Sequence, residues 1–112
     1  MELDLKAKFD QAITHGMNAR KACLEAKDAT IGCKEALKDH ETAIILEGSY
    51  TASGKNEKER EAWLRDRTGN RRDELLITER DERAAILALE VALDARRNLE
   101  SILKIMELER IL

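Results

Sequence analysis

The sequence predicts an all-α fold: an antiparallel hairpin of long, coiled-coil-like helices that assembles into a helical bundle. Three observations support this prediction. The 112 residues include no proline, and 38% of them are charged, against about 25% in ordinary domains. The apolar residues are mainly alanine, leucine and isoleucine and only 3% of residues are aromatic, which favours helices over strands. Apolar residues also recur at heptad spacing along the first half of the chain.

A first long helix is expected over residues 3–47. Its apolar positions alternate in steps of four and three residues, which is the spacing of a coiled-coil seam. The middle of this seam has small side chains, so a partner helix can approach it closely. The seam residues are Leu5, Phe9, Ala12, Gly16, Ala19, Cys23, Ala26, Thr30, Cys33, Leu37, His40 and Ile44. A neighbouring row widens the apolar face, and its members are Met17, Leu24, Ile31 and Ile45.

The two cysteines, Cys23 and Cys33, are expected to be small buried thiols of this seam. They lie ten residues apart in one helix. At a rise of 1.5 Å per residue their separation is about 15 Å, which is too far for a disulfide bond within the chain. Free thiols are typical of a reduced compartment, so we expect a cytoplasmic protein.

The first helix is expected to end at a turn over residues 48–55. Gly48 suits the position after a helix C-terminus, where a positive φ is needed. Asn56, followed three residues later by Glu59, resembles a capping box and begins the second helix.

The second helix is expected over residues 56–111, in a single domain that spans residues 1–112. Gly69 and Asn70 disfavour a helix interior, so both a break within residues 68–70 and a continuous helix remain open. This helix has two apolar stripes, and a single neighbouring helix covers only one of them. One stripe consists of Ala84, Leu87, Ala88, Val91, Ala95, Leu99, Ile102 and Met106.

The other stripe, together with the C-terminal apolar residues, is predicted to be an interface between copies of the chain. If the hairpin turns near Thr51, residue 3 lies opposite residue 99, and the apolar residues after it extend past the first helix. We therefore expect a homo-oligomer, most simply a dimer that forms a four-helix bundle. Docking of a different protein on this stripe is the alternative. The interface residues are Leu75, Ile86, Leu89, Leu93, Ile105 and Leu108.

A basic segment is the candidate contact surface for a partner or for nucleic acid. Arginines supply phosphate contacts and a tryptophan ring supplies a stacking surface for single strands. The alternative is that the tryptophan closes the end of the hairpin while the arginines pair with nearby acids. Residues 48–83 have nine charges of each sign, which favours this alternative. The segment contributes Trp63, Arg65, Arg67, Arg71 and Arg72.

The turn also resembles a phosphate-binding loop, but its spacing is wrong. That motif has four residues between its glycines and a Ser or Thr after its lysine. Here five residues separate Gly48 from Gly54, and Asn56 follows Lys55. We therefore expect a turn and no nucleotide site.

The remaining residues predict neither catalysis nor a cofactor. His15 and His40 have no companions at metal-ligand spacing, and no serine or carboxylate pair has a positioned base or acid partner. We expect a protein that is not an enzyme and has no metal. No apolar run reaches the 18 residues or so of a membrane helix, and Glu2 and Asp4 stand where a signal peptide would be basic and then apolar.

The turn motif resembles one found in small helical proteins of bacteriophages and prophages. The pattern is Gly-Lys-Asn, then Glu-Arg, then Leu-Arg, and it covers about a dozen residues. The matching residues are Gly54, Lys55, Asn56, Glu59, Arg60, Leu64 and Arg65. The resemblance implies an accessory role in phage DNA metabolism or against host defences, in the cytoplasm of the host cell, and it implies no catalytic residue.

Three functions follow as hypotheses. The first is an interaction protein that self-associates and binds another macromolecule. The second is a nucleic-acid-binding accessory factor for phage recombination or replication. The third is an inhibitor of a host defence nuclease, whose acidic surface would replace DNA phosphates and would include Asp28, Glu35, Asp39 and Glu41.

Overall fold

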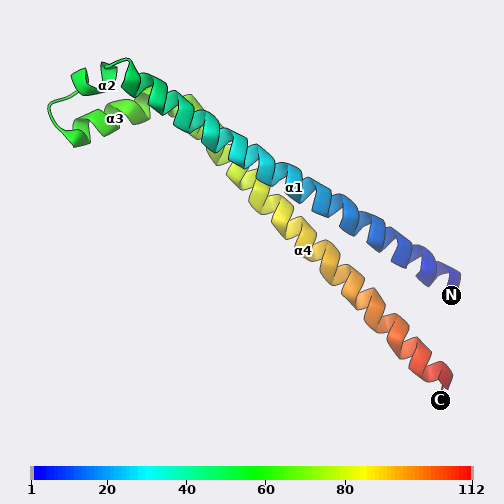
Figure 1. Ribbon diagram of the computed structural model, residues 1–112. Coiled ribbons are helices and arrows are strands. Elements are labelled where there is room, and N and C mark those ends of the chain that lie inside the picture. Colours follow the sequence, from blue (N-terminus) through cyan, green and yellow to red (C-terminus); the bar gives the residue numbers. More distant parts are fainter. Residues whose placement is uncertain (1, 112) are drawn as a thin grey trace. The chain divides into compact units, whose positions relative to one another are not determined.

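The computed structural model describes residues 2–111 and is helical along nearly all of them (Figure 1). No strand is present in this part of the chain. The predicted all-α helical hairpin is therefore confirmed. Its helices are α1 (Glu2–Leu46), α2 (Ser49–Ala52), α3 (Glu57–Arg67) and α4 (Gly69–Ile111).

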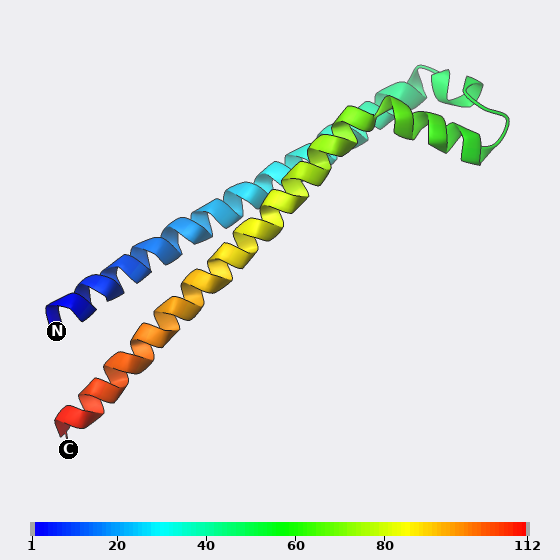
Figure 2. The ribbon, with the colours of Figure 1, turned by 180° about the vertical axis from the view of Figure 1, so that it is seen from behind.

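The described residues pack as two units, where the sequence predicts a single domain. The first unit pairs Met1–Glu25 with Arg83–Leu112, so it joins the beginning of α1 to the end of α4. The second unit is Ala26–Glu82, which holds the rest of α1, the short helices α2 and α3, and the beginning of α4. Both views show that the α1 and α4 segments of the second unit run side by side, whereas those of the first unit diverge toward their N- and C-terminal ends (Figures 1 and 2).

The heptad seam of α1 lies on the packed face in both units. Cys23, Thr30 and Ile44 are buried, and the other predicted seam residues are half-buried. By contrast, the neighbouring row that begins at Met17 stays exposed. The heptad spacing therefore identified the packed face of α1 correctly along its whole length.

Small seam residues allow the helices of the second unit to approach closely. Thr30 is 3% exposed, and its hydroxyl shares one proton between two backbone oxygens. One acceptor is the oxygen of Ala26 in its own helix, at 3.1 Å, and the other is that of Thr78 on α4, at 3.3 Å. A side chain this short reaches the backbone of a neighbouring helix only when the two helices pack without large side chains between them.

The register of the pairing differs from the expectation. Thr30 lies opposite Thr78, and Glu41 contacts Arg72, so the pairing is centred near residue 55 and not near Thr51. The short helices α2 and α3 lengthen the connection, which moves this centre toward the C-terminus.

The shifted register covers residues that were expected to extend past α1. In the first unit Leu5 and Phe9 line a cavity of about 260 Å³ together with Leu103 and Met106. Leu103 and Met106 are half-buried. The expectation that the apolar C-terminal residues as a group are uncovered within one chain is therefore wrong.

The turn has more structure than expected. Gly48 has the positive φ predicted for it, +77°, which a residue with a side chain adopts at a cost of about 1–2 kcal/mol. The short helix α2, Ser49–Ala52, follows directly within the predicted turn. The second helical tract is interrupted at Thr68, inside the segment where a break and a continuous helix were both open.

Candidate interaction surfaces

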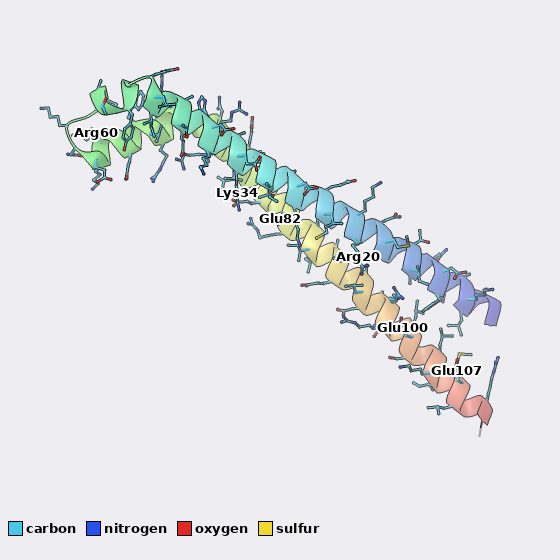
Figure 3. All side chains as sticks on the ribbon, in the orientation of Figure 1. Arg20, Lys34, Arg60, Glu82, Glu100 and Glu107 are labelled. Atoms are coloured by element: carbon cyan, nitrogen blue, oxygen red, sulfur yellow. The ribbon has the colours of Figure 1, made fainter. Side chains whose placement is uncertain are left out.

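The Gly-Lys-Asn…Glu-Arg motif builds the N-terminus of α3. The side chain of Asn56 accepts a hydrogen bond from the backbone N–H of Glu59 at 2.9 Å. The carboxylate of Glu59 accepts one from the N–H of Lys55 at 2.8 Å, one residue earlier than in an ordinary capping box. Arg60 lies at the beginning of α3 (Figure 3), and its Nε donates to the carbonyl of Gly54 at 3.3 Å.

Gly54 completes this cap because no larger residue fits there. A Cβ atom at this position would lie 2.7 Å from the Cβ of Glu59 and 3.2 Å from the backbone nitrogen of Arg60. The backbone must pass close to α3 for its N–H and C=O groups to reach Glu59 and Arg60. Four of the seven motif residues therefore have a structural explanation. Lys55 contributes only its backbone N–H group, and Leu64 and Arg65 lie outside the cap.

Trp63 and Arg67 form a stacked pair on α3. The guanidinium carbon of Arg67 lies 5.3 Å from the centroid of the Trp63 ring, within the range of a cation–π interaction. Trp63 is half-buried, whereas Arg65 and Arg67 are exposed. The predicted contact surface thus retains two exposed cations and one partly accessible ring on this helix.

Arg72 belongs to the internal packing of the second unit. Its Nη2 atom donates to Oε1 of Glu41 on α1 at 2.7 Å, and its Nε donates to the hydroxyl oxygen of Thr68 at 3.0 Å. Thr68 is 1% exposed, and its hydroxyl in turn donates to the carbonyl of Leu64 at 2.8 Å. Arg72 and Glu41 are therefore engaged with each other, although the sequence proposed them for surfaces that contact a partner.

The other charged candidates are exposed. Arg71 lies 3.7 Å from Glu74, and both side chains are about half exposed, so this ion pair contributes little to stability. The alternative interpretation, that the arginines pair with nearby acids, is thus correct for Arg71, whereas Arg72 pairs with Glu41, an acid distant in the sequence. Asp28, Glu35 and Asp39 are also exposed.

The predicted interface residues divide into two groups. Leu75, Ile86, Leu89 and Leu93 are half-buried within their own units. Ile105 and Leu108 are 57% and 61% exposed. Helix α1 runs beside α4 in each unit, so the first four residues lie toward the packed side of the hairpin. The role of these four residues in an interface between copies of the chain stays a prediction.

The stripe that the sequence assigned to the hairpin itself is mostly the exposed one. Leu87, Val91 and Ile102 are 61%, 59% and 44% exposed. The signal that sequence reasoning missed is Ala92, which is 1% exposed and follows half-buried Leu89 by three residues. A seam of small residues on α1 needs a small residue opposite it, and Ala92 supplies one.

Neither a metal centre nor a membrane helix is visible in the part of the chain that the structure describes. No group of three or more His, Cys, Asp or Glu side chains there is arranged to hold a metal ion. No helix there is both long and apolar enough to cross a bilayer. The sequence matches no protein-family model, and neither the curated proteins nor the solved structures contain a match.

Proposed function

We propose that this chain is a non-enzymatic accessory protein of the bacteriophage type that self-associates and binds another macromolecule. The surface area of the chain supports this most directly. Its accessible surface is 8746 Å² for a mass of 12.7 kDa. A compact monomer of that mass exposes about 6,200 Å². The excess of about 2,500 Å² is comparable with the area that each copy loses in a large obligate dimer.

The kind of surface that is exposed supports the same proposal. Within the described residues the buried hydrophobic side chains are Cys23, Ile44 and Ala92, and two of these are small. Apolar side chains much larger than those of Cys23 and Ala92, such as Leu87 and Ile105, face solvent. Full burial of such a side chain stabilises a protein by about 1.5–3 kcal/mol, so a second copy that covers several of them supplies what a single chain lacks.

Sedimentation equilibrium tests self-association. We expect a mass of twice 12.7 kDa at micromolar concentrations. We also expect a melting temperature that rises with protein concentration, because association stabilises only the folded chain. A mass of one chain at every concentration, with a constant melting temperature, contradicts the proposal.

A second function, nucleic-acid binding, is favoured by one observation. Trp63 and Arg67 are stacked on each other, and Arg65 and Arg71 are exposed nearby in sequence. Such a set resembles the combination of an aromatic platform and cations that holds single strands. The engagement of Arg72 with Glu41 removes one of the predicted contacts.

For this second function we expect a labelled single-stranded oligonucleotide to bind in low salt and to dissociate as salt rises. The Arg65→Glu/Arg67→Glu variant should lose binding because each arginine releases counterions from the phosphates. The Arg80→Glu/Arg83→Glu variant has the same change of charge on exposed α4 positions and should bind more like the wild type. Equal loss in both variants, or no binding at about 50 mM salt, contradicts this function.

A further inference from the structure

The outward face of α4 in the first unit has a heptad seam of its own. Seven residues recur there in steps of four and three, and every one of them is exposed. Six of the seven are apolar. Helix faces that meet only water are usually polar, whereas a helix that packs against another helix shows this spacing. We call this row the outer seam; it consists of Ala84, Ala88, Val91, Ala95, Asn98, Ile102 and Ile105.

We infer that the outer seam packs against the outer seam of a second copy of this chain, and that the two α4 helices run antiparallel. This inference rests on the self-association proposed above and identifies its surface. The charge of the segment fits a second copy better than a charged partner. Residues 84–105 have three acidic and three basic side chains, so two copies do not repel each other and neither sign of charge is attracted.

The distribution of side-chain size along the outer seam determines the orientation. The first half of the outer seam has small side chains, those of Ala84 and Ala88. The second half has large side chains, those of Ile102 and Ile105. An antiparallel pair places the large half of each copy against the small half of the other, which keeps the helix axes at one distance. A parallel pair would place isoleucine against isoleucine at one end and alanine against alanine at the other, which leaves a gap.

The area of this face corresponds to a small dimer interface. From Ala84 to Ile105 the outer seam is about 32 Å long at 1.5 Å per residue. One helix face is about 10–12 Å wide, so the flat area is roughly 350 Å² for each copy. The ridged accessible surface is larger, which places this face at the low end of specific interfaces, where each partner contributes less than about 600 Å².

The other exposed apolar row of the first unit serves as the matched control. Among the side chains that the structure describes, this row on α1 includes Met17 and Leu24 within the unit, and they are 66% and 58% exposed. As a pair they are more accessible than Val91, at 59%, and Ile102, at 44%. A substitution by glutamate in either row therefore adds charge to solvent-facing positions and should leave the helix content of a single chain unchanged.

The first experiment measures the dimer dissociation constant by sedimentation for two full-length variants. We expect Val91→Glu/Ile102→Glu to weaken the dimer by about 100-fold, because each substitution introduces a charge twice into a symmetric apolar interface. Met17→Glu/Leu24→Glu should dimerise like the wild type, and far-UV circular dichroism should show equal helix content in both variants. A dimer that resists the first variant but dissociates in the second overturns this inference and leaves self-association intact. A monomeric wild-type protein overturns both.

The second experiment tests the orientation, with Cys23→Ala and Cys33→Ala as the background. A thiol-specific cross-linker of about 10 Å is applied to Ala88→Cys, to Ile102→Cys and to their mixture. In an antiparallel pair centred near residue 95, position 88 of one chain is about 21 Å from position 88 of the other, and the same holds for position 102. Position 88 of one chain lies close to position 102 of the other. We expect a cross-linked dimer only in the mixture. Cross-linking of either variant with itself alone shows a parallel pair and overturns the orientation.

Discussion

Replacing Ala92 by leucine is expected to destabilise the protein by about 2–3 kcal/mol, because three additional carbon atoms enter a packed interface. Ala92 is 1% exposed on α4 in the first unit. The α1 seam in the same unit has small residues at Ala12, Gly16, Ala19 and Cys23, which is the composition of two helices in close approach. A leucine at position 92 must either take up a strained rotamer or separate the helices along several turns.

Urea unfolding followed by circular dichroism measures this effect. Wild type and variant are compared at one protein concentration, because association contributes to the measured stability. The matched control is Ala7→Leu, the same change at an exposed position of α1 in the same unit, and it should shift the free energy of unfolding by less than about 0.5 kcal/mol. Equal stabilities of Ala92→Leu and Ala7→Leu would show that the helices are not in close contact at Ala92.

The chain of hydrogen bonds from Thr68 through Arg72 to Glu41 is the second site where a large effect is expected. Thr68→Val removes the acceptor of the Arg72 Nε–H group and should cost about 1–2 kcal/mol, because the valine leaves that donor without its protein partner. Glu41→Gln should cost less, about 1 kcal/mol, because both side chains of the ion pair are about a third exposed and solvent screens their attraction.

A double-mutant cycle tests whether the three side chains act as one unit. Both substitutions act on Arg72, so their effects should not add, and a coupling of about 0.5 kcal/mol or more is expected between them. Arg71→Gln is the control, because Arg71 lies 3.7 Å from Glu74 with both side chains about half exposed. Strict additivity of Thr68→Val and Glu41→Gln would show that Arg72 does not connect them in solution.

The local features of this protein were predictable because they depend on neighbours in sequence. The N-cap at Asn56 and the positive φ of Gly48 each require only a few adjacent residues. The seam of α1 was predictable for the same reason, since one helix with a strict heptad spacing has one apolar face. The motif at Gly54 was recognisable as a pattern, but only the hydrogen bond from the Arg60 side chain to the Gly54 carbonyl explains why an arginine occurs there.

The partners of the arginines in the basic segment were only partly predictable. Arg71 and Arg72 are one residue apart and have the same side chain, so no local pattern separates their roles. The structure separates them because Arg72 lies opposite Glu41, 31 residues earlier in the chain, whereas Arg71 has Glu74 beside it on its own helix. Partners distant in sequence depend on the register of the hairpin, and the register depends on the length of the connection.

The sequence by itself determined the helical class, the packed face of α1 and the helix cap that follows the turn. Only the tertiary structure decided which of two apolar stripes on α4 is packed inside the chain. Both stripes have helical spacing, so periodicity favours neither. The packed stripe has the large side chains Ile86, Leu89 and Leu93, with buried Ala92 on the same side of α4, because large side chains on one helix fill the space beside the small-residue seam of the other. The stripe with Val91 and Ile102 then remains exposed.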